Sequence, residues 1–265
     1  MKKISGATVF PTGLFERHFS PGRWIKLLRA DLIQYNHNLL IATMAVFGAV
    51  LVVLVASAPL TGRWQPHKIF VPGILFLGGI IITSYSFTEL KDPIQRSAYL
   101  LVPGSTLEKV AARLLLTLVG FPLSALTLYW TTSLVGAGLG SLIWGESFAI
   151  YRPFTEDTWR LLTVYPIVHG IFFLGAVWFH KGAAFKTLLA VVLAQIGLVV
   201  VTFFIFRIVF FEFFQGMSVS FNLSKGADIG WWTSAVQIGR VFIYVLFGPW
   251  LWVISYLRLA DTEVQ

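Results

Sequence analysis

The sequence predicts an all-α membrane protein with six transmembrane helices. Of its 265 residues, 57% are hydrophobic and only 12% are charged, and the mean hydropathy is +0.78. Soluble globular domains carry about twice that share of charged residues. The apolar stretches also recur at lengths near the ~20 residues that a helix needs to cross a hydrocarbon core of ~30 Å. The expected fold is a polytopic helical bundle, in which the lack of cysteine excludes disulfides and thiolate-ligated metal.

Residues 1–38 are expected to form a cytoplasmic segment that contains an amphipathic interfacial helix. Ser20 and Pro21 have the order of an N-cap and a first helical position. Apolar and basic residues then follow on opposite sides of a helix: Trp24, Leu27, Leu28, Leu32 and Tyr35 on one, and Arg23, Lys26 and Arg29 on the other. We expect the apolar side to lie at the acyl boundary and the basic side to face anionic headgroups. A soluble amphipathic helix is the alternative.

A six-helix transmembrane domain is expected over residues 39–258, followed by a short cytoplasmic tail over 259–265. The six spans are 39–60, 69–90, 105–135, 161–179, 187–206 and 233–257. Pro122 predicts a kink in the third span, and the glycines between 136 and 140 are expected to end it. The aromatic stretch 210–232 is too polar in its second half to span, so we expect a re-entrant outer segment before the last span.

Lysine and arginine are distributed unequally between the two sides of these spans. The side that holds both termini and the link between the second and third spans carries most of them, so the positive-inside rule makes that side cytoplasmic. The formal charge of +8 is therefore interpreted as a topology signal. Because the basic residues are scattered among apolar runs, we expect membrane lipids and not nucleic acid as partners.

The link between the second and third spans has strong local signals for a short crossing helix. Asp92 and Pro93 predict its start, because the carboxylate accepts from free amides and proline has no amide to leave unpaired. The helix cannot pass Pro103, which leaves about nine residues or roughly 13 Å. Ser105 and Glu108 then have the spacing of a capping box, which predicts the start of the third span.

This arrangement, and the string YLLVPGSTLEK over residues 99–109, resembles the cytoplasmic loop of bacterial ABC exporter permeases of the type-2 superfamily. The resemblance implies a permease subunit in the bacterial cytoplasmic (inner) membrane, with both termini cytoplasmic. It implies a second permease subunit, identical or related, and separate ABC ATPase subunits that bind ATP and Mg. No cofactor is expected in this chain itself.

In such permeases the loop docks on the ATPase, so the resemblance implies a docking role for ten residues here. They are Asp92, Pro93, Ile94, Gln95, Arg96, Tyr99, Pro103, Ser105, Glu108 and Lys109. For Asp92 and Glu108, helix capping alone is an equally good interpretation.

The chain has no phosphate loop, no H-E-x-x-H pair and no G-x-S-x-G elbow, so we expect no enzyme activity, no catalytic residue and no metal site. His169 and Arg207 are candidates for the substrate path, because ionisable residues in membrane spans are often functional. A hydrogen bond to a neighbouring helix is the alternative for His169, and an anchor at the membrane interface is the alternative for Arg207.

The function that these observations favour is the membrane subunit of an ABC transporter, an exporter of an amphiphilic or lipid-like substrate. A non-transporting assembly or sensor subunit bound to an ATPase is one alternative. A lipid-modifying enzyme embedded in the membrane is a more remote one. Its acid and base groups would come from Glu146, Glu156, Asp157 and His169.

Overall fold

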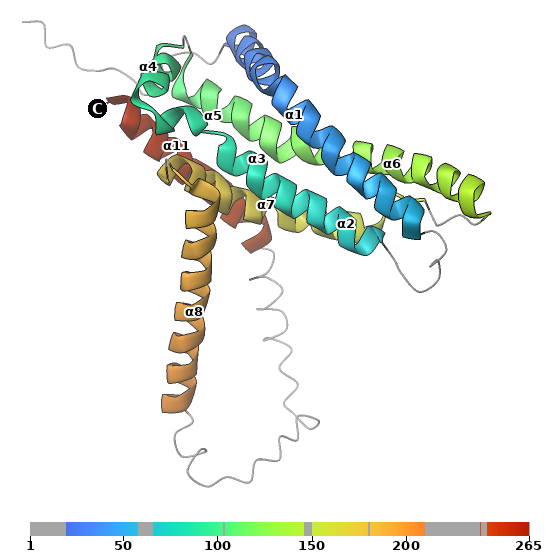
Figure 1. The fold of residues 1–265 in the computed structure, drawn as a ribbon. Helices are drawn as coiled ribbons and strands as arrows, with labels where there is room; N and C mark the ends of the chain where they lie inside the picture. The colour runs from blue at the N-terminus through green and yellow to red at the C-terminus, as the bar shows by residue number, and fades with distance from the viewer. Residues whose placement is uncertain are drawn as a thin grey trace, which may run out of the picture.

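The computed structural model describes residues 20–57, 66–102, 104–145, 150–179, 181–209, 239 and 243–264. All the regular structure in these residues is helical. Figure 1 shows most of the helices lying along one another in an elongated bundle, while one long helix leaves the bundle at a steep angle. The all-α prediction is confirmed for this part of the chain.

Helix α1 runs without interruption from Pro21 to Ser57. The sequence predicts an interfacial helix before residue 38 and a separate first span after it, whereas the structure joins the two in one helix. The reason is local, since residues 30–40 contain neither proline nor glycine to end a helix. Trp24, Leu27 and Leu28 of the predicted stripe are half-buried, and α1 packs against α5 (Thr106–Leu115), while Leu32 of the same stripe is exposed.

The second span consists of α2 (His67–Gly73), the π-helical segment η2 (Ile74–Gly78) and α3 (Gly79–Tyr85). It ends earlier than the predicted residue 90, at a turn that leads into a short 3-10 helix, η3 (Thr88–Lys91). Helix α4 (Pro93–Leu101) follows and is the predicted crossing helix.

The third span is formed by α5, the π-helical segment η4 (Leu116–Gly120) and α6 (Phe121–Trp144). The prediction that glycines end this span near residue 135 was wrong. Gly136 and Gly140 are buried on α6, and α6 packs along α1. Buried small residues let two helices approach closely. The helix ends instead at Gly145, whose φ of 71° is a left-handed C-cap.

The remaining helices are α7 (Glu156–Trp178), α8 (Ala183–Val209) and α11 (Gly248–Val264), the last preceded by the π-helical segment η5 (Ile243–Phe247). α7 and α11 pack along each other. The expected tail over 259–265 is helical as far as Val264, and Leu259 is fully buried. The predicted re-entrant segment lies outside the described residues.

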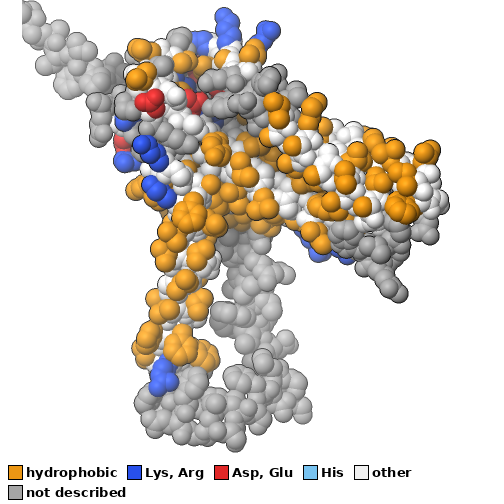
Figure 2. Space-filling view, in the orientation of Figure 1, with side chains coloured by type: hydrophobic (Ala, Val, Ile, Leu, Met, Phe, Trp, Pro, Cys, Tyr) orange, Lys and Arg blue, Asp and Glu red, His pale blue; other side chains and the backbone are white. Residues whose placement is uncertain are grey.

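Four helices in the described part of the chain are long and apolar enough to cross a membrane: His67–Tyr85, Thr106–Trp144, Glu156–Trp178 and Ala183–Ile208. A shorter apolar stretch covers Ile41–Ser57. Helix α8 has the highest mean hydropathy, 2.8, and its most apolar window has no buried residue. Figure 2 shows hydrophobic side chains covering α8, as hydrocarbon contact requires. The four helices indicate a multi-pass membrane protein.

Candidate functional site at the α4–α5 element

The start of α4 is built as the sequence predicts. The Ile94 amide donates to Asp92 Oδ1 at 3.3 Å, and Pro93 occupies the first turn. The helix has nine residues and ends at Val102, whose backbone is extended (ψ 124°) as expected for a residue before proline. Pro103 itself lies outside the described residues. The crossing helix is therefore a separately capped unit.

The predicted capping box at the start of α5 is also confirmed. The Glu108 amide donates to Ser105 Oγ at 3.2 Å, and the Ser105 amide donates to Glu108 Oε2 at 3.0 Å. Since each side chain satisfies the other's backbone amide, α5 begins sharply at this point.

Glu108 does more than the sequence predicts, because its second oxygen binds α1. Oε1 accepts from the Ser20 amide at 2.7 Å and from Arg23 Nη2 at 3.3 Å. The Glu108 side chain is completely buried. One carboxylate thus joins the first turn of α5 to the start of α1.

A buried arginine, Arg113, forms a second centre one turn further along α5. Its Nη1 and Nη2 donate to the two oxygens of Glu89, each at 3.0 Å, and its Nε lies 3.8 Å from Asp31 Oδ2. Nη1 also donates to the Ser86 carbonyl. The exposed fractions of the Arg113 and Glu89 side chains are 7% and 13%. This ion cluster connects α5 to η3 and, through Asp31, to α1.

The C-terminal half of α4 packs on this ion cluster through Tyr99. The Arg113 guanidinium lies over the Tyr99 ring at 4.7 Å and over the Phe87 ring at 5.0 Å. Lys109 Nζ donates to the Tyr99 carbonyl at 3.2 Å. Cation–π contacts are strongest where water is excluded, so α4 is attached firmly to α5 along one side.

The other side of α4 is open. Ile94 and Leu101 are 78% and 83% exposed, Gln95 is exposed, and Arg96 is half-buried. Figure 2 shows acidic and basic side chains gathering at the end of the bundle that carries α4. Six of the ten predicted docking residues form two groups: Tyr99, Ser105, Glu108 and Lys109 hold the element together, and Ile94 and Gln95 face outward.

Burial raises the pKa of Asp31, and this outweighs the attraction of Arg113. A carboxyl whose folded-state pKa is raised favours the folded state below its unfolded pKa of ~3.9, and this contribution is lost as pH rises through the folded value. We therefore expect Asp31→Asn to leave the melting temperature unchanged near pH 4 and to raise it at pH 7. Thermal unfolding of both proteins across this range is the measurement. A lower melting temperature for the variant at pH 7 would mean that the Arg113 attraction outweighs desolvation.

The two substrate-path candidates lie in different surroundings. His169 is 2% exposed, and Thr117 Oγ1 and Trp252 Nε1 contact its two ring nitrogens at 2.7 and 3.2 Å. This favours the structural alternative, a histidine hydrogen-bonded to neighbouring helices. Arg207 is exposed near the end of α8, as expected for an interfacial anchor. The structure does not bring the two residues together.

The groups considered for a lipid-modifying enzyme do not converge in the part of the chain that the structure describes. Glu156 pairs with Arg160 at 2.6 Å on the surface, Asp157 is exposed, and His169 is buried elsewhere on α7. Glu146 lies outside the described residues. Among the described residues, no group of three or more His, Asp or Glu side chains could hold a metal ion.

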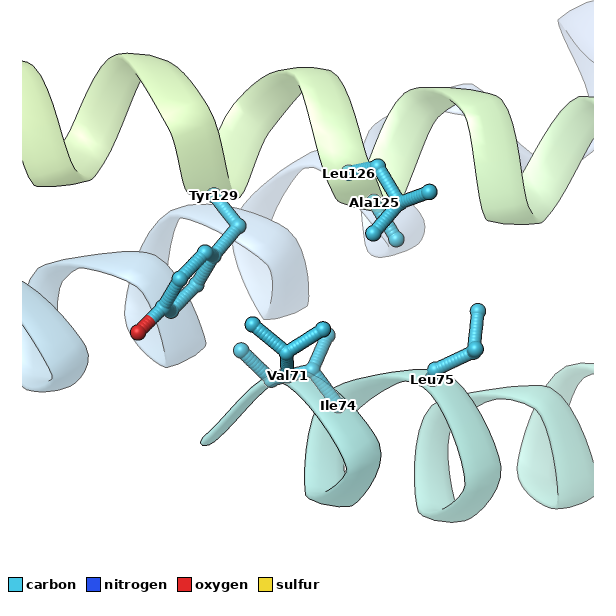
Figure 3. A pocket seen from close by; sticks show the side chains of 6 residues that line it. All are labelled: Val71, Ile74, Leu75, Ala125, Leu126 and Tyr129. Carbon is cyan, nitrogen blue, oxygen red and sulfur yellow. The ribbon is translucent and has the colours of Figure 1, made fainter. Parts of the chain in front are cut away.

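A small pocket lies between the second and third spans, further along the bundle from α4 (Figure 1). Its lining is Val71, Ile74, Leu75, Ala125, Leu126 and Tyr129 (Figure 3). The Tyr129 hydroxyl points away from the other five residues and contacts His67 Nδ1 at 2.9 Å. The other five described lining residues are apolar.

Comparison with protein-family models, with curated proteins and with solved structures gave no match for this chain. No family is identified. The resemblance of residues 99–109 to exporter permeases remains a prediction that rests on the residues themselves.

Proposed function

We propose that the protein is the transmembrane permease subunit of an ATP-driven exporter, and that α4 docks on a separate ATPase subunit. The observation that carries the proposal is the construction of α4. One side of this short helix is attached to α5 by Tyr99 and Lys109. On its other side, Ile94 and Leu101 are exposed. A rigid helix with an uncovered apolar surface suits docking into a groove.

The length of the third span supports a docking site beyond the lipid. Thr106–Trp144 has 39 residues, or about 58 Å at 1.5 Å per residue, nearly twice the ~30 Å hydrocarbon core. Its polar start, with Glu108, Lys109 and Arg113, is the part least suited to hydrocarbon. A push on α4 would then reach the membrane along a continuous helix.

The proposal includes six spans with both termini in the cytoplasm. Residues 41–57 and the last helix would add two spans to the four long apolar helices, and the lysine and arginine distribution orients them. Two such subunits would work with two ATPase subunits, which bind ATP and Mg. The apolar spans favour an amphiphilic or lipid-like substrate.

Two leucines allow a matched test of docking. Leu101 and Leu142 are 83% and 85% exposed, the first on α4 and the second near the end of α6. We expect Leu101→Glu to abolish co-purification of an ATP-binding subunit and Leu142→Glu to preserve it, with both variants folded by size-exclusion chromatography. If Leu101→Glu retains the subunit as the parent does, or if the parent copurifies with none, the docking role of α4 is refuted.

A further inference from the structure

The π-helical segment η4 leaves one backbone carbonyl without a hydrogen-bond donor in its own helix. The Phe121 amide donates to the Leu116 carbonyl, five residues back, so it is not available to the Thr117 carbonyl. The next residue, Pro122, has no amide to offer. The Thr117 carbonyl is therefore left without a donor from its own helix, at a buried position in the middle of the bundle.

Tyr165 of α7 supplies the missing donor. Its hydroxyl donates to the Thr117 carbonyl at 2.8 Å, and its side chain is 2% exposed. A buried carbonyl without a partner is costly, so this bond holds η4 in its π-helical register against α7. π-helical segments inside long helices often occur at functional positions.

The side chain of Thr117 continues the network to the last span. Its hydroxyl donates to the Arg113 carbonyl at 2.8 Å and so accepts from His169 Nε2 at 2.7 Å. The Trp252 indole donates to His169 Nδ1 at 3.2 Å. These directions agree only with a neutral imidazole that carries its proton on Nε2. Each of the three donors Thr117 Oγ1, His169 Nε2 and Trp252 Nε1 then has one acceptor.

The chain of bonds begins at the ion cluster that holds α4. Arg113 binds Glu89 with its side chain and Thr117 with its carbonyl. From Thr117 the chain crosses α7 at His169 and reaches α11 at Trp252. Three separate helical spans are therefore joined by hydrogen bonds, starting at Arg113, whose guanidinium lies over the Tyr99 ring of α4.

We propose that Thr117, Tyr165 and His169 are positioning residues, which fix the register of η4 and transmit displacement of the α4–α5 element to α11 through Trp252. This inference rests on the proposed function, because it needs a partner that displaces α4. It adds the route by which the last span responds.

The absence of cysteine allows two pairs of spin labels to test the inference. One pair joins Ser97 of α4 to Thr131 of α6, and the other joins Leu257 of α11 to Thr131; all three positions are exposed. Distances are measured in the complex with its ATP-binding subunit, before and after addition of ATP, Mg and vanadate. We expect both distances to change in the parent.

The variants then separate transmission from docking. In Thr117→Val the α4 distance should still change, while the α11 change should fall by at least half; Thr117→Ser, which keeps the hydroxyl, should restore it. Trp252→Phe provides a second interruption if Thr117→Val folds poorly. An α11 change of parental size in a folded interruption variant overturns the inference alone. An α4 distance that does not respond in the parent overturns the proposed function and the inference with it.

Discussion

Arg113→Met is expected to destabilise the folded protein by about 3–5 kcal/mol, the usual cost of removing one partner from a buried ion pair. Methionine replaces the aliphatic stem of arginine with an unbranched apolar side chain but has no guanidinium group. The Glu89 carboxylate, 13% exposed, therefore loses its two hydrogen bonds from Arg113, each at 3.0 Å. Arg113→Lys should not restore stability, since an ammonium cannot bind both oxygens and stack on Tyr99 and Phe87 in the same way. The melting temperature of the purified subunit is the measurement.

Arg160 provides a matched control for this prediction. It also pairs with a glutamate, Glu156, at 2.6 Å, but both side chains are more than two thirds exposed. Arg160→Met should therefore change the melting temperature little. The double variant Arg113→Met/Glu89→Gln should recover part of the loss, because the unpaired charge is gone. Equal effects of Arg113→Met and Arg160→Met would show that burial of the cluster contributes nothing.

Glu108→Ala should destabilise the protein by about 2–4 kcal/mol, more than a capping box alone. Loss of a cap costs ~1 kcal/mol, and buried amides left without an acceptor cost about 1–3 kcal/mol more. Here the amides of Ser105 and Ser20 both depend on Glu108. Glu108→Gln should be intermediate, since the amide keeps one acceptor oxygen. Thermal unfolding of the parent, Glu108→Gln and Glu108→Ala measures this order of stability.

Asp92→Ala is the control for helix capping without burial. Asp92 caps α4 by accepting a hydrogen bond from the Ile94 amide, and this bond lies near the surface. Its loss should cost about 1 kcal/mol or less. If Glu108→Ala costs no more than Asp92→Ala, the link between α5 and α1 is not a source of stability.

The local features of the α4–α5 element could be predicted because their causes lie within a few residues. The Asp92 cap, the nine-residue helix and the Ser105–Glu108 box each follow from side chains that reach their own backbone. The contact between Glu108 and Ser20 joins residues far apart in the chain, and no local pattern specifies such a pair. The existence of the element was therefore predictable, and its attachment to α1 was not.

One signal for that attachment was present in the sequence. Asp31 continues the helical stripe of Trp24, Leu27 and Leu28, the side of α1 that lies partly buried. An acidic residue on a stripe of that kind requires a partner, and Arg113 is that partner.

In the third span, some features follow from the sequence and others depend on packing between helices. The sequence predicts a kink at Pro122, and the structure has the π-helical segment Leu116–Gly120, separated from Pro122 by one residue. The sequence predicts that the glycines near its end break the helix, although buried glycine in an apolar helix often marks a close contact with another helix. Only the packing of α6 along α1 distinguishes the two roles.

The bond between Ser20 and Glu108 also constrains how the protein is made. The two residues are 88 positions apart, so at a synthesis rate of roughly 5–20 residues per second the start of α1 waits several seconds for its acceptor. The first two apolar segments are synthesised during that interval. The contact between the start of α1 and α5 can therefore form only after the chain has been made as far as Glu108.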